Sequence, residues 1–211
     1  MPRLLLVRHG ETEQKSSERL WGRTDVKLSG LGLKQAERLR DRLAGVKIDT
    51  IYSSSMKRAL TTAEIIASQH NQAVIPCVEL REVDFGEIEG LSFAEIDQRF
   101  PELAAELKNE RKPDFRYPGG ESLGELGERV AKFLERLNQH TDGDSILVVA
   151  HFGVLRTIIY QLMDMELKHF SRFYLDLASF SILEHYPQGA ILQRLNDVSH
   201  LEGLEWPGQS S

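Results

Sequence analysis

Two histidines occupy matching places in the sequence, each directly after a buried apolar run. His9 follows the run Leu4 to Arg8, His151 follows the run Ser145 to Ala150, and a glycine comes within two residues of each. A single histidine in such a place is most often a structural residue. Two of them, with Arg8 beside the first, indicate an anion site, because a neutral imidazole can act as a nucleophile and a guanidinium holds oxyanions.

A second source of positive charge lies where Lys57 and Arg58 fall in the first turn of an expected helix. Cations at this end gain nothing from the helix dipole, which favours anions there. A bound anion would explain them, because backbone N–H groups at a helix N-terminus hold phosphate and an arginine adds a bidentate clamp. The alternative is that both side chains are merely solvated.

The segment 80–90 contains four carboxylates, interrupted by glycines that prevent a helix. Asp84, Glu87 and Glu89 are each expected to be acids of a surface loop. One carboxylate of this segment beside a bound phosphate would suit a general acid.

The elements that must position these side chains alternate between short apolar strands and amphipathic helices. This alternation predicts an α/β fold, a three-layer sandwich with a mostly parallel central sheet flanked by helices. Ligands of such sheets bind beyond the carboxyl ends of the strands, which is where His9 and His151 stand. Apolar spacing and capping boxes predict strands at 3–8, 51–52, 145–150, 180–184 and 190–193, and helices at 29–44, around 59–66, from 92, from 122 to about 139, and at 154–163.

Length and charge limit the classes of function. The 211 residues predict one domain over 1–202 with a fraying tail at 203–211. A net charge of −6 disfavours nucleic acid and anionic membrane surfaces as partners. Apolar runs fall far short of a membrane span of roughly 20 residues, so no membrane partner and a cytoplasmic location are expected. The sequence leaves a homo-oligomer open.

Cysteine and histidine usage predicts neither a disulfide nor a metal site. The single cysteine, Cys77, has an apolar context typical of a small residue in or beside a strand rather than a reactive thiol. The other histidines show no His-x-x-x-His pair and no cysteine partner, so they are expected to be structural or solvated. They are His70, His140, His169, His185 and His200. Phosphate-binding P-loop and Gly-x-Ser-x-Gly motifs are also missing from the sequence.

Taken together, these blocks resemble the histidine phosphatase superfamily, which has the phosphoglycerate-mutase-like fold. The resemblance extends from about residue 3 to 201, and a lone Arg-His-Gly would be weak evidence for it. The matching blocks, in family order, are Arg8-His9-Gly10-Glu11, Gly22 to Asp25 with Leu28 to Ala36, Ser53 to Ala63, Glu82 to Gly90, Pro118 to Ser122 with Arg129-Val130, and His151.

The resemblance implies a role for each residue of the site. His9 would be the nucleophile that becomes phosphohistidine, and Glu82 would donate a proton to the leaving group. Arg8, Arg58 and His151 would bind the phosphate oxygens. No metal and no other cofactor is implied. Nearby cations should keep His9 neutral, and a bound substrate dianion should raise the pKa of Glu82.

The sequence departs from the family pattern at two positions expected near the substrate. Lys15 stands where many members have an asparagine that contacts phosphate, and Phe152 stands where many have glycine. A backbone N–H at position 152 can still meet phosphate, while the side chain would narrow or redirect the pocket. Candidates for contacting the alcohol portion of the substrate are Trp21, Arg23, Arg81, Arg116 and Phe152.

The expected function is hydrolysis of a small phosphate monoester through a phosphohistidine. The substrate class extends from α-ribazole-5′-phosphate to sugar and glycerate phosphates, because the motifs do not separate them. The alternative is a cofactor-dependent phosphoglycerate mutase. Mutase-like members have a longer insert before the Pro-Gly-Gly-Glu landmark, whereas only the 36 residues 83–118 intervene here. A phosphate-binding module without catalysis would require a decayed site.

Overall fold

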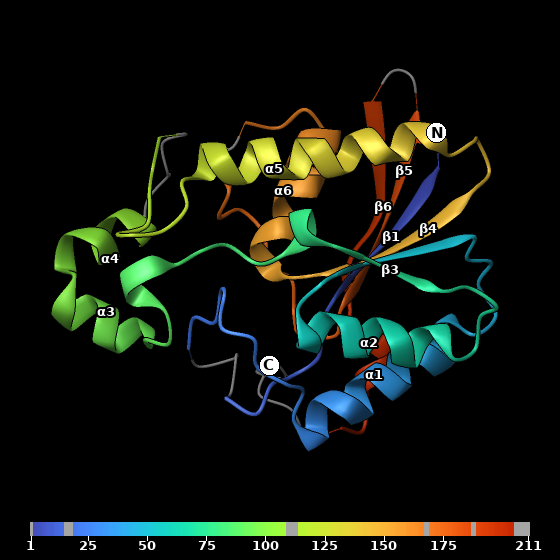
Figure 1. Cartoon of the computed structure of the whole chain (residues 1–211), viewed down its shortest axis with the longest axis horizontal. Helices are drawn as coiled ribbons and strands as arrows, with labels where there is room; N and C mark the ends of the chain where they lie inside the picture. Colours follow the sequence, from blue (N-terminus) through green and yellow to red (C-terminus); the bar gives the residue numbers. More distant parts are fainter. Residues whose placement is uncertain (1, 15–18, 109–113, 167–168, 187–188, 205–211) are drawn as a thin grey trace.

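The computed structural model describes residues 2–14, 19–108, 114–166, 169–186 and 189–204 (Figure 1). Its described strands form one sheet in the order β3-β2-β4-β1-β5-β6. The first four strands of this order run parallel, while β5 is antiparallel to both β1 and β6. The bounds are β1 Arg3–Arg8, β2 Thr50–Ser54, β3 Val74–Cys77, β4 Ser145–Ala150, β5 Phe180–Tyr186 and β6 Gly189–Asp197.

Helices cover both faces of this sheet, so the predicted three-layer α/β sandwich with a mostly parallel sheet is confirmed. Figure 1 shows α1 and α2 on one face and α5 and α6 on the other. The helix bounds are α1 Gly30–Leu43, α2 Lys57–Ala67, α3 Phe93–Arg99, α4 Pro101–Lys108, α5 Leu123–Glu135 and α6 Phe152–Leu162.

The side-chain alternation of the central strands divides the core in two. Leu5 and Val7 of β1 belong to the apolar cluster with α1 and α2, whereas Leu4 and Leu6 belong to the cluster with α5 and α6. Successive strand residues point to opposite faces, and all four are at most 1% exposed. This double burial explains why the strand reads as a continuous apolar run.

The register of β1 with β4 determines where the site forms. Arg8 pairs with Ala150, so the two strands end level with one another. The next residues continue this alignment, because the backbone N–H of His9 donates to the carbonyl of Ala150 at 3.1 Å. Two histidines 142 positions apart in the sequence are thereby placed side by side.

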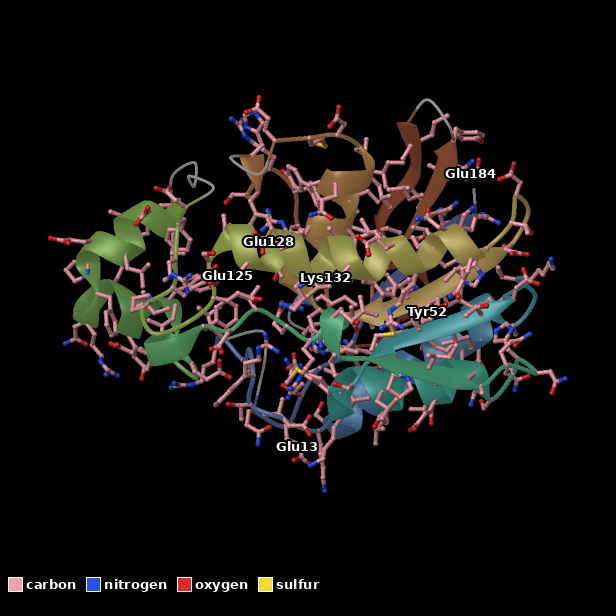
Figure 2. The ribbon with its side chains drawn as sticks, turned by 45° about the horizontal axis from the view of Figure 1, so that its top comes forward. Glu13, Tyr52, Glu125, Glu128, Lys132 and Glu184 are labelled. Atoms are coloured by element: carbon pink, nitrogen blue, oxygen red, sulfur yellow. The ribbon has the colours of Figure 1, made fainter. Side chains whose placement is uncertain are left out.

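Capping residues set the helix starts, as the sequence predicted. Ser92 opens α3 and Ser122 opens α5, each with a reciprocal capping box to a glutamate three residues on. Glu125, Glu128 and Lys132 lie along the exposed side of α5 (Figure 2). The predicted helix from 122 to about 139 is α-helical only to residue 135 and continues as a 3-10 helix over 136–139.

Cys77 is the buried last residue of β3, as predicted for a small apolar residue. Burial raises the pKa of its thiol to about 11, which keeps it protonated and unreactive. Within the described ranges, no helix has the length and apolarity needed to cross a membrane.

Candidate active site

A cavity of about 110 Å³ opens beyond the carboxyl ends of β1 and β4. In Figure 1 these ends point toward the side of the molecule that carries α3 and α4. The cavity combines charged residues with a wall of aromatic ones. Its lining residues are Arg8, His9, Arg19, Leu20, Trp21, Glu82, Phe85, Phe93, Phe152 and Tyr174.

His9 is 3% exposed, and one of its two ring nitrogens is held by the backbone. Its Nδ1 lies 2.7 Å from the carbonyl oxygen of Gly10, so Nδ1–H donates and the lone pair resides on Nε2. Nε2 has no hydrogen-bond partner among the described residues. Burial lowers the pKa of His9 well below its ordinary value, and Arg58 and Arg8 lower it further. The predicted neutral imidazole is confirmed, although burial contributes more than the cations on which the prediction rested.

Close backbone packing fixes the loop that carries His9. A Cβ at Gly10 would lie 2.6 Å from the carbonyl oxygen of Gly32, so only glycine fits there. The N–H of Gly10 also faces the hydroxyl of Thr62 at 3.4 Å. The turn after β1 is therefore pressed against α1 and α2, which limits movement of the imidazole.

His151 lies beside His9, with 5.0 Å between the ring centroids. Both of its ring nitrogens are engaged: Arg58 Nε donates to Nδ1 at 3.2 Å, and Nε2 lies 2.8 Å from the hydroxyl of Ser54. Because Nδ1 accepts, Nε2 carries the proton in the neutral ring. Burial lowers the pKa of His151 well below its ordinary value, and Arg58 adds to this.

Arg58 is fully buried and grips the loop that precedes α1. Its Nη1 donates to the carbonyl of Thr24 at 2.9 Å, and its Nη2 donates to those of Trp21 and Gly22 at 3.1 and 2.8 Å. With Nε on His151, four of its five N–H donors are occupied by the protein. Burial lowers the pKa of Arg58 to about 10, so it stays charged at neutral pH. Its charge therefore lies beside His151 and lowers the pKa of His9 more than Arg8 does.

For Lys57, where the sequence left an anion-bound and a solvated side chain open, the structure shows an exposed side chain at the start of α2. The backbone N–H of Lys57 donates to Asp25 Oδ1 at 2.7 Å, and the Lys57 ammonium lies 3.6 Å from Asp25 Oδ2. A side-chain carboxylate thus occupies the position that phosphate would take, and it also pairs the exposed cation.

Glu89 is not the loop-surface acid that the sequence suggested. Its carboxylate accepts the backbone N–H of Gly22 at 3.0 Å and that of Thr24 at 2.9 Å. These contacts turn the carbonyls of the same segment toward Arg58. Glu89 therefore shapes the cradle of a buried cation. The spacing of residues along the sequence does not indicate such a role.

Arg8 lines the cavity at 7% exposure. Its Nη1 donates to the carbonyl of Leu175 at 2.5 Å, and its guanidinium lies over the ring of Phe152, 5.0 Å from the centroid. These contacts fix the guanidinium while other N–H groups remain for a ligand. Phe152 also lines the cavity, as expected of a residue that narrows it.

Glu82 is the carboxylate of the acidic segment that reaches the cavity. Its Oε1 accepts the N–H of Val83 at 2.9 Å and that of Gly153 at 3.2 Å. A Cβ at Gly153 would lie 2.8 Å from Oε1, which explains the glycine after Phe152. Burial raises the pKa of Glu82, opposed by these N–H groups and by Arg58. The pKa is thus raised by the protein itself, whereas the sequence argument assigned this effect to bound substrate.

The remaining sequence candidates divide into three groups. Trp21 lines the cavity, as Phe152 does. Arg23 and Arg81 line a separate cavity of about 390 Å³, and Arg116 pairs with Glu125 at 2.5 Å, so none of the three lines the cavity that contains His9. Lys15 lies outside the described residues.

Several site residues were missed because their signal is weak or tertiary. Ser54 is simply the end of β2, and the carbonyl of Leu175 has no sequence signature. Aromatic residues such as Phe93 and Tyr174 are ordinarily expected in the core. Here both line the cavity, and their exposed fractions are 65% and 58%. Over the described ranges, no group of three or more His, Cys, Asp or Glu side chains could hold a metal ion.

Comparison with known proteins agrees with this geometry. The model of the histidine phosphatase superfamily, branch 1, matches residues 4–198. Phosphoserine phosphatase 1 of Hydrogenobacter thermophilus is 34% identical over 202 residues, covering 95% of each chain. The metal-independent phosphoserine phosphatase of Arabidopsis thaliana is 33% identical, covering 95% of this chain and 84% of its own.

A solved structure gives the same answer at the level of the fold. The putative alpha-ribazole-5′-P phosphatase from Escherichia coli superposes with a TM-score of 0.82 and 30% identity, covering 93% of this chain and 96% of its own. The resemblance inferred from the motifs is confirmed. The chain belongs to branch 1 of the histidine phosphatase superfamily and is a phosphatase, a phosphoric monoester hydrolase.

Proposed function

We propose that this phosphatase transfers the phosphoryl group of a small phosphate monoester first to Nε2 of His9 and then to water. The observation that carries the proposal is the state of His9. It is buried, its Nδ1 is committed to the Gly10 carbonyl, and its pKa is lowered, so Nε2 carries a lone pair at a cavity wall. A nucleophilic histidine needs this arrangement.

Positive charge would bring the substrate to this nitrogen. A monoester dianion repels nucleophiles, and the guanidinium of Arg8 at the cavity wall, with that of Arg58 beside His151, offsets this charge. Fixed charges in a water-poor site stabilise the equatorial oxygens as the P–O bond lengthens. No metal and no other cofactor has a part in the proposed reaction.

Glu82 would handle the proton in both half-reactions. In the first, the N–P bond forms, the P–O bond to the alcohol breaks, and protonated Glu82 gives its proton to the departing alkoxide. In the second, water attacks phosphorus, Glu82 takes back a proton, and the N–P bond breaks to release inorganic phosphate. The raised pKa of Glu82 and its place in the cavity wall support this assignment.

The substrate would be a small phosphorylated metabolite. Relatives carry the names of phosphoserine and alpha-ribazole phosphatases, and a mycobacterial neighbour, 26% identical, is a glucosyl-3-phosphoglycerate phosphatase. The alternative of a phosphoglycerate mutase is disfavoured by the short segment 83–118. A mutase must exclude water from its phosphorylated form, and the described part of this segment contains one 3-10 helix at 86–88 and the short helices α3 and α4.

Rapid mixing with a nitrophenyl phosphate ester tests the proposal. We expect a burst of nitrophenol equal to the enzyme concentration, followed by slower turnover that releases inorganic phosphate. With 3-phosphoglycerate, any reaction should yield phosphate rather than 2-phosphoglycerate. Interconversion of the two phosphoglycerates without phosphate release would establish the mutase instead.

A further inference from the structure

Half of the residues that line the cavity are aromatic. Phe85, Phe93 and Phe152 line it together with Trp21 and Tyr174. Phe93 is 65% exposed and Tyr174 is 58% exposed, whereas large apolar side chains usually stay inside. An exposed apolar rim beside a polar site is typical of a surface that a ligand covers.

A second cavity adjoins this one. It has a volume of about 80 Å³ and shares Leu20, Phe85, Phe93 and Phe152 with the first. The surface that lines this second cavity is mostly apolar, and Val83 and Phe170 contribute to it. A benzene ring fills an engineered apolar cavity of about 150 Å³. The second cavity alone is smaller than that, so one flat ring would extend across both adjoining cavities.

Few of the cations that line the two cavities are available to bind a second anionic group of the substrate. Among the described residues, the lining cations of the two cavities are Arg8, Arg19 and Arg156. Arg19 already donates to the Gly90 carbonyl at 2.7 Å and to Glu95 at 2.8 Å.

Arg156 is 4% exposed and is covered by aromatic rings. Its guanidinium carbon lies 4.6, 4.7 and 5.4 Å from the ring centroids of Phe152, Phe170 and Phe173. Such contacts satisfy much of a buried cation's charge. Arg8 therefore remains as the cation for the phosphate, and among the described lining residues a carboxylate on a small alcohol would meet no further unpaired cation.

We propose that the alcohol portion of the substrate carries an aromatic or similarly flat apolar group, which binds in the aromatic cleft formed by Phe85, Phe93 and Phe152. The proposal rests on the proposed function, since it assigns the phosphate to Arg8 and His9. Glu82 lines the same cavity, so it would be within it to protonate the scissile oxygen of a substrate bound in this way. Specificity would then come from aromatic packing rather than from a second ion pair.

Two alkyl monoesters with alcohols of similar acidity test this assignment. Burying one aromatic ring is worth roughly 10- to 100-fold in binding, so kcat/KM for 2-phenylethyl phosphate should exceed that for ethyl phosphate by about 10-fold or more. O-phosphoserine and 3-phosphoglycerate should be no better than ethyl phosphate. A phenylethyl-to-ethyl ratio below about three, or a preference for either carboxylate substrate, would overturn the proposal.

Substitutions at the rim of the cleft test it independently. Single aromatic contacts suggest that Phe93→Ala lowers the phenylethyl-to-ethyl ratio by about 3- to 10-fold, and Tyr174→Ala should do the same. Ile191→Ala, which removes an exposed apolar side chain on β6, should leave the ratio unchanged. A ratio that both rim variants leave unchanged would contradict the aromatic cleft.

The two proposals fail in different ways. Hydrolysis of every ester at similar rates, with a normal burst, would remove the aromatic cleft and leave the phosphohistidine mechanism standing. The lack of a burst with any ester would overturn the mechanism and the cleft with it.

Discussion

His9 and His151 stand at level ends of neighbouring strands, but their ring nitrogens are held in different ways. The Nδ1 of His9 donates to a carbonyl and Nε2 makes no hydrogen bond within the described structure, whereas His151 uses one nitrogen on Arg58 and the other on Ser54. Both rings are buried and both have a lowered pKa. The comparison teaches that a low pKa alone does not identify a nucleophile: a free lone pair does, and His9 has it.

The largest expected difference between the two histidines is in turnover. His9→Ala should lose on the order of 10⁴-fold or more in kcat, because removing a nucleophile abolishes the covalent route. His151→Gln should lose about 10²- to 10³-fold, the usual effect of removing one group that stabilises transferred charge. Steady-state hydrolysis of a nitrophenyl ester measures both. Equal losses would remove the distinction drawn from their hydrogen bonds.

A smaller effect, confined to poor leaving groups, is expected at Glu82. Glu82→Gln should slow the phosphoryl-transfer burst by about 10²- to 10⁴-fold for an alkyl ester and much less for a nitrophenyl ester, whose alcohol leaves without a proton. The burst is the proper measurement because Glu82 also serves the hydrolysis of the intermediate. Asp84→Asn is the matched control, since Asp84 accepts the N–H of Gly86 at 3.0 Å and is not part of the cavity lining. A selective loss in Asp84→Asn would assign the proton to that carboxylate.

The smallest expected effect is on stability against acid. The unfolded chain binds a proton on each histidine near pH 6.5, while burial prevents His9 and His151 from doing so in the folded chain. Keeping the two rings neutral therefore contributes to the free energy of unfolding. The contribution is complete above the pKa of histidine in the unfolded chain, and it is lost as the pH falls below that value, by about 1.4 kcal/mol per pH unit for each histidine.

Urea unfolding at a series of pH values checks this linkage. His151→Gln should flatten the decline in the free energy of unfolding by about that amount between roughly pH 6 and pH 5, and His9→Gln should do likewise. A decline identical to that of the unsubstituted protein would mean that the ring takes up its proton in the folded state.

The charged residues of the site could be predicted from the sequence far better than its aromatic ones. His9 and His151 can be predicted as site residues because each follows a strand, and the ends of parallel strands meet at one edge of the sheet. Glu82 could be separated from Asp84, Glu87 and Glu89 only through the family resemblance. The geometry now supplies the physical reason, which is a glycine at 153 that leaves room for its carboxylate.

The rest could not be predicted because it depends on backbone atoms and on distant segments. Arg58 is held by carbonyls of residues 21–24, whose direction is set by Glu89, and neither contact follows from residue type. The aromatic wall gathers residues from four separate segments, and apolar patterns assign such residues to the core. The sequence could not decide whether the start of α2 binds an anion, because the carboxylate that accepts its Lys57 N–H comes from Asp25, which is distant in sequence.

The measurement that tests the central claim most directly is the location of the trapped phosphoryl group. The enzyme would be quenched in base during the burst, because phosphohistidine is stable there and labile in acid, and its peptides would be mapped by mass spectrometry. We predict one phosphoryl group on His9, retained in His151→Gln and lost in His9→Ala. A phosphoryl group on His151, or full turnover by His9→Ala, would contradict the account.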